Sequence, residues 1–403
     1  MHLRLMNPPE SPDHRGRTFV EFAVVIVCTL AFAAFALGIC VLMLTGNRPG
    51  GRDFISFWAA GRQIVHHANP YDGARIFQIE RSLGFPDGAQ VLIMRNPPSA
   101  LCLVMPLGLL GPRSASLFWS LLLLAAFAVS VHMLWVMHGR PDNKLHLLGY
   151  SFAPALACIF GGQTSLFALL GFVLFLRLHR KHPFLAGLSL WLCALKPHLF
   201  LVAGAALILW VVVSRSYRIL AGLALAVISS SLVASYLDPS VWVEYRQMMH
   251  SSGLEHEFIP CLGVALRFVI DPRAMWLQYI PAVIGCAWAV HFYLLHRDRW
   301  EWMEHGALLM LVSILLSPYA WFTDQALLIP ALLAGAYCAT SRGQIEVLAL
   351  ASAVIEIEQL SGVTMHSALL LWTAPLWVGW YLYVSSRSRL GLEHRTLPQG
   401  GVL

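Results

Sequence analysis

Residues 145–176 read LHLLGYSFAPALACIFGGQTSLFALLGFVLFL and contain no Asp, Glu, Lys or Arg. A helix crosses the hydrocarbon layer of a membrane in about 20 apolar residues, so this stretch is too long for one crossing. Gly161, Gly162 and Gln163 interrupt its middle, and glycines beside a polar residue are typical of a turn. The stretch therefore predicts two membrane-spanning helices that meet at a polar turn.

The whole chain has the composition of a membrane protein. Of its 403 residues, 58% are apolar and 12% are charged, against about 45–50% and about 25% in soluble proteins. So few charges do not cover a folded surface in water, which excludes disordered, nucleic-acid-binding and secreted disulfide-rich proteins. The 8 cysteines contain no CxxC pair and are expected to be small buried hydrophobes.

Further uncharged runs predict more spans, and two of the longest are interrupted by polar residues. Lys196-Pro197 divides the run 184–213, and the segment from Ser317 to Asp324 divides the run 306–337. The other candidate spans are 22–47, 114–139, 219–237, 274–296 and 359–386, with a weaker one at 345–358. We therefore expect an all-α polytopic protein with about twelve spans, forming one integral membrane domain over residues 1–403.

The positions of Lys and Arg predict how the chain is oriented, because cytoplasmic loops carry an excess of these residues. With residues 1–18 inside, most of the 27 basic residues fall in short cytoplasmic segments. Both termini, including the tail 387–403, are then cytoplasmic, and residues 45–113 form a large outer loop of a plasma (inner) membrane protein. Pro97 to Leu110 is short for a span, and we treat it as re-entrant or interfacial; if it crosses, every later loop changes sides.

The outer loop begins with a predicted amphipathic helix. Apolar residues at 54, 57, 58, 61 and 65 have helical spacing, with Arg62 and Gln63 on the other side, as in helices that lie along a membrane surface. Asp53 stands at the start of this helix, where it serves as an N-cap, as a catalytic group or as both. A turn at Asn69-Pro70-Tyr71-Asp72 and a second short helix to Leu83 follow.

The polar interruptions all fall on the predicted outer side. Lys196 lies between two apolar halves, and an ionisable group within a membrane points to a function, although snorkelling to the interface is the alternative. One carboxylate and one cation beside an interfacial helix suit the transfer of a group from a lipid-borne phosphate to a hydroxyl. There is no Asp-x-Asp triplet. His66-His67 and Glu255-His256-Glu257 lack metal-site spacing, so neither a metal nor another cofactor is expected.

In these residues the chain resembles glycosyltransferase family 87, the polyprenyl-phosphate-mannose-dependent mannosyltransferases with a GT-C type fold. The motifs that carry the resemblance run in order along residues 20–385. They are Asp53-Phe54 with Trp58-Ala59-Ala60-Gly61-Arg62, Asn69-Pro70-Tyr71-Asp72, Pro97-Pro98, Met105-Pro106-Leu107, Gly162-Gln163, Ala186-Gly187-Leu188, Leu195-Lys196-Pro197 and Leu316-Ser317-Pro318 with Asp324. The family usually has an aromatic residue where this chain has Asn96, and its Ser-Pro segment often carries an aromatic or His near its acidic residue.

The resemblance implies a transferase that takes a sugar, typically mannose, from a polyprenyl phosphate at the outer face and gives it to a glycolipid or glycan. By the family's pattern Asp53 is the general base of an inverting displacement, and Lys196 and Gln163 line the donor side. We expect His198 or Arg95 to help Lys196 neutralise the departing phosphate. Asp324 and Tyr319 complete the expected donor site, and the expected substrate groove contains Trp58, Arg62, Asn96 and Trp321.

Two alternatives from other classes stay open at this point. A secondary transporter or flippase suits twelve spans, but the halves show no internal repeat and the polar groups gather on one face. A ligase or polymerase of lipid-linked glycans is the other alternative. In each case the partners are membrane lipid and lipid-linked sugars, and no nucleic acid is expected.

Overall fold

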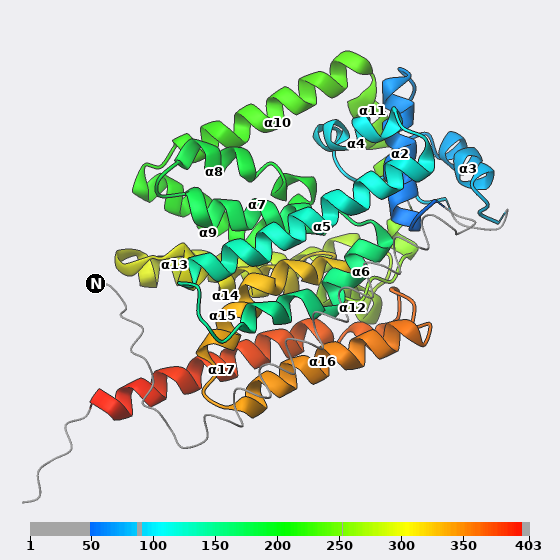
Figure 1. The fold of residues 1–403 in the computed structure, drawn as a ribbon. Helices are drawn as coiled ribbons and strands as arrows, with labels where there is room; N and C mark the ends of the chain where they lie inside the picture. The colour runs from blue at the N-terminus through cyan, green and yellow to red at the C-terminus, as the bar shows by residue number, and fades with distance from the viewer. Residues whose placement is uncertain (1–48, 87–90, 252, 397–403) are drawn as a thin grey trace, which may run out of the picture.

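The computed structural model describes residues 49–86, 91–251 and 253–396, and every regular element in these ranges is a helix (Figure 1). Within them, five helical segments are long and apolar enough to cross a membrane. They are Pro112–Met137, Pro197–Ser214, Arg218–Leu237, Met275–Arg299 and Ala368–Arg387. The predicted all-α membrane class is therefore confirmed. The count of about twelve spans and the GT-C arrangement stay predictions, and the predicted span 22–47 lies outside the described residues.

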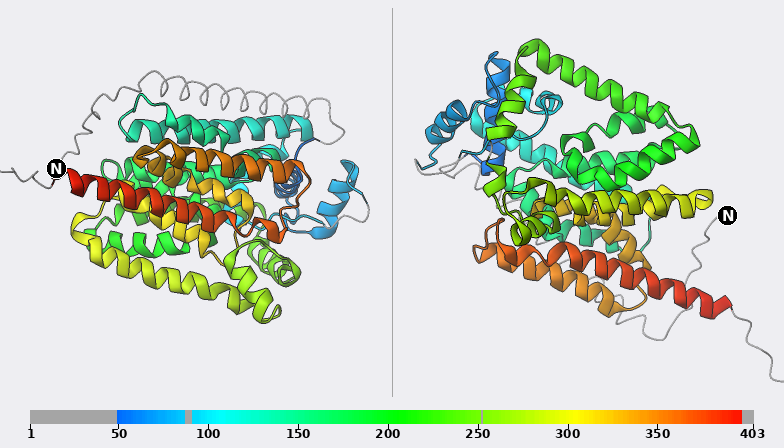
Figure 2. Two further views of the ribbon diagram at one scale, coloured as in Figure 1. Left: turned by 90° about the horizontal axis from the view of Figure 1, so that it is seen from below. Right: turned by 180° about the vertical axis from the view of Figure 1, so that it is seen from behind.

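The segment expected to form the outer loop contains the two short helices that the sequence predicts. Helix α2 (Arg52–Val65) lies across the ends of the long helices (Figures 1 and 2). It buries every residue from 54 to 61, so burial is not limited to the predicted apolar face, while Arg62 on the predicted polar side is exposed. Helix α3 (Gly73–Ser82) begins where the Asp72 carboxylate accepts hydrogen bonds from two backbone N–H groups of its first turn, the usual role of an N-cap.

Helix α4 (Leu101–Gly108) follows the single turn η1 (Pro98–Ala100) and packs closely on α2. Glycines permit this approach: a Cβ added at Gly61 would lie 2.2 Å from the Val104 carbonyl oxygen, and one added at Gly108 would lie 2.3 Å from that of Gly61. With 8 residues, α4 is about 12 Å long, less than half of a hydrocarbon layer of about 30 Å. This length favours the expected re-entrant or interfacial segment over a crossing.

The three predicted breaks are present, and each has a local cause. Gly162 adopts a φ of +81° between α6 (Ala153–Gly161) and α7 (Ser165–Leu178), a conformation that favours glycine. Lys196 has a non-helical backbone, with φ −135° and ψ 68°, before Pro197, because a proline disfavours helix in the residue that precedes it. Ser317-Pro318 ends α14 (Trp302–Leu315).

These breaks divide the apolar runs into short elements. Before and after Lys196 the chain forms α8 (Pro183–Ser189), η3 (Cys193–Leu195), η4 (Pro197–Phe200) and α9 (Leu201–Ser214). Beyond Pro318 come η8 (Phe322–Leu328) and α15 (Ile329–Cys338). The longest helices lie away from these breaks, and the weak span predicted at 345–358 lies in one helix of 19 residues, α16 (Arg342–Leu360). The remaining elements are α5 (Pro112–Met137), η2 (Leu145–Ser151), α10 (Arg218–Leu237), α11 (Val241–Ser251), η5 (Leu254–His256), α12 (Leu262–Ile270), η6 (Met275–Tyr279), α13 (Ile280–His296), η7 (Arg297–Arg299), α16 (Arg342–Leu360), η9 (Ala368–Leu370) and α17 (Thr373–Thr396).

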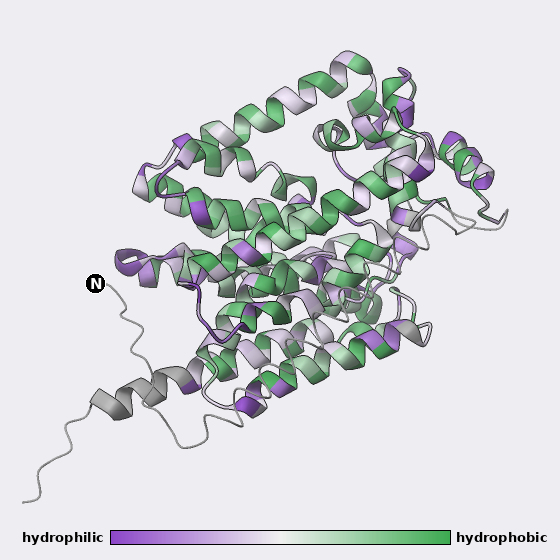
Figure 3. Ribbon diagram, viewed as in Figure 1, coloured by the Kyte–Doolittle hydropathy of each residue, from purple (hydrophilic) through white to green (hydrophobic). Residues whose placement is uncertain are grey.

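The connections gather at two opposite ends of the molecule. The end with α2 and α3 also holds the connections that the sequence places outside, and the short basic turns lie at the other end (Figures 1 and 3). Between the ends, α7 and α14 are largely buried, whereas α10 and α13 expose large apolar side chains such as Leu232 and Val283. An apolar exterior between two polar ends is the surface expected of a protein in a bilayer.

Candidate active site

Lys196 is the centre of a buried polar cluster. Its Nζ donates to Asp324 Oδ1 at 2.6 Å, to Gln163 Oε1 at 2.9 Å and to Ser165 Oγ at 3.0 Å. An ammonium group has three N–H donors, so all three point to protein acceptors. The predicted donor-side residues Gln163, Lys196 and Asp324 are therefore in direct contact, although they come from three separate breaks in the chain.

Asp324 is the fully buried counter-charge of this cluster, with a side-chain exposure of 0%. Its Oδ1 also accepts from Ser165 Oγ at 2.6 Å, and its Oδ2 accepts from the Trp321 backbone N–H at 2.8 Å. A carboxylate away from water is stable only when it is paired and hydrogen-bonded. Both oxygens of Asp324 meet this condition, so the Lys196–Asp324 pair is internally compensated.

Asp53 lies against the Gly161-Gly162 turn, close to this cluster. A Cβ added at Gly161 would lie 3.2 Å from Asp53 Oδ2 and 3.9 Å from Gln163 Cγ. Asp53 and Gln163 thus both reach within 4 Å of one point. The turn is held in place because Trp119 Nε1 donates to the Gly162 carbonyl oxygen at 2.7 Å. Asp53 is half-buried in the first turn of α2, where the helix N-terminus stabilises negative charge.

His198 and Tyr319 form a second part of the site. Their rings stack at 3.8 Å, and Ser317 Oγ bonds to both backbones, donating to the His198 carbonyl oxygen at 3.2 Å and to that of Tyr319 at 2.7 Å. Burial raises the pKa of Tyr319 above its ordinary value, Asp324 raises it further, and Arg95 opposes this shift. The two Ser317 hydrogen bonds thus tie the His198 segment to the Tyr319 segment.

Arg95 stands at the rim of the site and is paired with Glu257 through two hydrogen bonds, Nη1 to Oε2 at 2.8 Å and Nη2 to Oε1 at 2.5 Å. The side chains of Arg95 and Glu257 are 24% and 13% exposed. Asn96, the next residue after Arg95, is buried. Its side-chain Nδ2 donates to the Leu195 carbonyl oxygen at 2.8 Å, and its backbone carbonyl oxygen accepts from Tyr71 Oη at 3.1 Å. Asn96 therefore attaches the Arg95 segment to the residue before Lys196.

The aromatic residues predicted for a substrate groove lie further out. Trp58 is buried and its Nε1 donates to the Leu110 carbonyl oxygen at 3.0 Å, with the Arg62 guanidinium 5.6 Å from its ring. This contact joins α2 to the end of α4. Trp321 is half-buried and meets the ring of His366 edge-on at 4.9 Å. A groove formed by these residues together with Asn96 stays a prediction.

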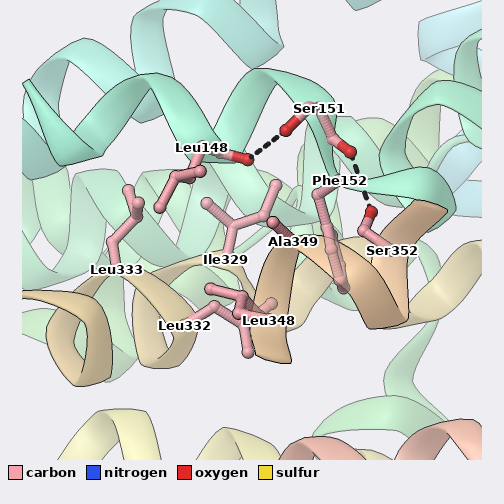
Figure 4. Close-up of a pocket in the computed structure, with 10 residues that line it drawn as sticks. Leu148, Ser151, Phe152, Ile329, Leu332, Leu333, Leu348, Ala349 and Ser352 are labelled. Atoms are coloured by element: carbon pink, nitrogen blue, oxygen red, sulfur yellow. Dashed lines mark hydrogen bonds between the residues drawn. The ribbon is translucent and has the colours of Figure 1, made fainter. Parts of the chain in front are cut away.

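Two cavities in the described part of the chain are lined by other residues than these. One cavity, of about 20 Å³, is lined mainly by apolar side chains of η2, α15 and α16 (Figure 4). Beside it, Ser352 Oγ donates a hydrogen bond to the Ser151 carbonyl oxygen at 2.8 Å. The other is a surface groove of about 500 Å³ between the end of α3 and the start of α5. In the described part of the chain, no three His, Cys, Asp or Glu side chains lie together as metal ligands would.

Two polar residues of the site were not among the predicted ones. Ser165 bonds to both members of the Lys196–Asp324 pair, and its only sequence signal is a hydroxyl after the Gly-Gly-Gln-Thr turn. Glu257 was considered only as part of a poor metal motif, because nothing near it in sequence indicates that its partner is Arg95. The arrangement as a whole offers a half-buried carboxylate, a neutralised ion pair behind it and a guanidinium at the rim.

Residues 95–318 match the family model described as glycosyltransferase family 87, which covers more than half of the chain. No curated protein and no solved structure matches the chain. The matched range includes Arg95, Gln163 and Lys196, whereas Asp53 and Asp324 lie outside it. Their parts in the site therefore rest on the geometry described above.

Proposed function

The chain belongs to glycosyltransferase family 87, and from this premise we propose that it transfers a hexose, mannose, from a polyprenyl-phosphate donor to a hydroxyl of a glycolipid or glycan. Membership of a glycosyltransferase family favours an enzyme over the transporter that the sequence leaves open. The single observation that supports this reaction best is the shared corner at Gly161, where Asp53 and the Gln163 end of the polar cluster both lie within 4 Å of one point.

In this proposal Asp53 is the general base of a single displacement at the anomeric carbon. The acceptor oxygen forms the new bond to that carbon as its proton passes to the Asp53 carboxylate. The bond from the carbon to the phosphate oxygen breaks, its electron pair stays on the phosphate, and the configuration inverts. A phosphate leaves at neutral pH without a proton, so one base is sufficient.

We assign a positioning role to the Lys196–Asp324 pair, in place of the phosphate contact expected from sequence. All three Nζ donors of Lys196 have protein acceptors, and Asp324 has no exposed surface. One of those acceptors is Gln163, which follows the Gly161-Gly162 turn against which Asp53 lies. The pair thus holds the turn that supports the base, and the departing phosphate lies on the Arg95 side, near His198 and Tyr319.

The proposal also includes the placement in the membrane. The end that carries α2, α3 and the candidate site faces outward, and both termini and the basic turns are cytoplasmic. The separation of the polar and basic connections into two ends supports this orientation (Figure 3). A GT-C type fold of about twelve spans in the plasma (inner) membrane belongs to the same proposal.

The proposal is tested by supplying membranes that contain the full chain with labelled polyprenyl-phosphate mannose, glucose or arabinose in turn. We expect the mannose label to move, and Asp53→Asn to reduce this transfer by roughly 10²- to 10⁴-fold, the usual contribution of a general base. Asp72→Asn is the matched control in the same loop, since Asn caps a helix as well as Asp does. Full transfer by Asp53→Asn would overturn the assignment of the base.

A further inference from the structure

The Arg95–Glu257 pair has the geometry of a phosphate contact. Both terminal nitrogens of the guanidinium donate to the two carboxylate oxygens, at 2.8 and 2.5 Å. The arginine fork binds carboxylates and phosphates through the same pair of parallel hydrogen bonds. Glu257 therefore covers the face of Arg95 that a phosphate would use.

The surroundings of the pair distinguish it from a purely structural contact. Arg95 and Glu257 keep 24% and 13% of their side-chain surface exposed, whereas Asp324 in the central cluster keeps none. Asn96, the residue after Arg95, donates to the Leu195 carbonyl oxygen at 2.8 Å, and His198, whose ring stacks on Tyr319, follows three residues after Leu195. Arg95 is thus both accessible and adjacent to the part of the site to which we assign the departing phosphate.

The backbone on each side of the pair is held independently of it. Asn96 is bonded to the Leu195 carbonyl oxygen and to Tyr71, and the Glu257 carbonyl oxygen accepts from Arg267 Nη2 at 3.3 Å. Separating the two side chains therefore leaves both segments attached. An exchange between Glu257 and a phosphate on Arg95 therefore does not require either backbone segment to detach.

We propose that Glu257 and the phosphate of the lipid donor compete for the Arg95 guanidinium, an inference that rests on the proposed function. The donor is a phosphodiester with one negative charge. As the bond between the sugar and the phosphate oxygen breaks, the electron pair stays on that oxygen and the phosphate gains a second charge. Arg95 then favours the phosphate over the singly charged carboxylate, so the exchange stabilises the transition state more than the bound donor.

This competition makes Glu257 a positioning residue that acts through Arg95 and aids product release. When the lipid phosphate leaves, the carboxylate returns to the guanidinium. Glu257→Gln removes the charge that competes and keeps the shape of the side chain. It is expected to bind a lipid phosphate more tightly, and Arg95→Lys, which loses the fork, is expected to bind it more weakly.

The test measures the dissociation constant of farnesyl phosphate, a short prenyl monophosphate, for the full chain in detergent. We expect Glu257→Gln to lower this constant and Arg95→Lys to raise it, each by about tenfold, which is the scale of one charge-assisted contact. Glu257→Gln should lower the constant less in the Arg95→Lys background than in the wild type, since Glu257 acts through the residue at position 95. Glu255→Gln is the matched control in the same segment, because Glu255 pairs with His256, and it should leave the constant unchanged.

Three outcomes overturn the competition. One is that Glu257→Gln weakens binding as Arg95→Lys does, which would make Glu257 a structural support. Another is that wild-type protein transfers sugar and binds farnesyl phosphate, but Glu257→Gln leaves the dissociation constant unchanged. This result would overturn the competition and leave the proposed function standing. The third is that wild-type protein neither binds farnesyl phosphate nor transfers sugar, which overturns the proposed function as well. Thermal melting of each variant identifies any loss of binding that comes from unfolding.

Discussion

Two carboxylate–cation pairs lie beside the candidate site, and they differ in how completely the protein encloses them. Lys196–Asp324 is closed: all three ammonium donors have protein acceptors, and the carboxylate has no exposed surface. Arg95–Glu257 is open: its two side chains meet through a fork of two hydrogen bonds and remain partly exposed. Distance along the chain does not explain the contrast, because both pairs join segments more than 120 residues apart.

The difference shows that a cation in a membrane protein is not automatically available to a substrate. A buried pair is costly to form and strongly destabilising to break, which suits a fixed support. A partly exposed pair contributes little to stability, so its members can change partners at small cost. We therefore expect changes in the closed pair to act through folding and changes in the open pair to act through binding and rate.

The largest effect is expected from breaking the closed pair. Lys196→Met leaves the Asp324 carboxylate buried without its counter-charge, at a cost of about 3–5 kcal/mol of stability. Replacing both residues, as Lys196→Met with Asp324→Leu, removes the buried charge and should recover most of the stability. Thermal melting in detergent checks both variants. A double variant as unstable as the single one would show that the pair does not act as a compensated unit.

Breaking the Arg95–Glu257 pair should affect the transfer rate more than the stability. Arg95→Ala is expected to lower the melting temperature less than Lys196→Met does, since Glu257 keeps some contact with solvent whereas Asp324 keeps none. It should reduce transfer from the lipid-phosphate donor by roughly 10²-fold, the usual loss when one charge-stabilising donor is removed. Initial rates and melting curves of the same preparation measure the two quantities. A large loss of stability with little change in the rate per folded molecule would reverse the roles of the two pairs.

A smaller effect is expected where the closed pair supports the base. In Gly161→Ala the new Cβ lies 3.2 Å from Asp53 Oδ2, close enough to displace the carboxylate by a few tenths of an ångström. Misplacing a catalytic group in this way is expected to lower kcat by about tenfold, with a near-normal melting temperature. Gly204→Ala in α9 is the matched control, because no atom lies within 4 Å of its Cβ position. Equal kcat values in the two variants would count against Asp53 as the base.

The smallest expected effect concerns a pair of like charges. Burial, a hydrogen bond that the protonated Glu244 carboxyl donates to the Asp238 carboxylate, and the negative charge of Asp238 raise the pKa of Glu244 from 4.5 to about 7. The folded protein thus keeps a proton that the unfolded chain loses, so this contribution to stability is complete below pH 4.5 and is lost as the pH rises towards 7. Because Glu244 is partly exposed, we expect at most about 1 kcal/mol.

Melting curves at pH 5 and pH 8 measure this contribution. Wild-type protein should lose more stability between the two values than Glu244→Gln does, since the amide does not titrate. An identical pH dependence in both proteins would show that Glu244 ionises normally.

The breaks in the fold could be predicted from the sequence because their causes are local. Lys196-Pro197, Ser317-Pro318 and the Gly161-Gly162 turn interrupt apolar runs, and each stands between two helices of the structure. The amphipathic pattern around Trp58 likewise predicts α2. The number of membrane spans is harder to predict from the sequence, because spanning helices that are shortened by such breaks have the same length as buried helices that do not cross the membrane.

The membership of the polar cluster could be predicted only in part. Lys196, Gln163 and Asp324 are conspicuous as polar residues in apolar surroundings, but the sequence does not show that Lys196 uses all of its donors within the protein. That depends on how α7 and η8 pack together, which brings Ser165 to both charges. Glu257 was missed for the same reason, since its partner is 162 residues away.

The division of labour between the two pairs is tested most directly by phosphorus NMR of farnesyl phosphate bound to the full chain. The pH dependence of its chemical shift measures the second pKa of the bound phosphate, which a contacting cation lowers. We expect this pKa to be below its value in free farnesyl phosphate for wild-type protein and for the double variant Lys196→Met with Asp324→Leu. It should return towards the free value in Arg95→Ala. The assignment of the phosphate to Arg95 would be contradicted if the pKa of the bound phosphate returned towards the free value in the Lys196→Met, Asp324→Leu variant and stayed at the wild-type value in Arg95→Ala.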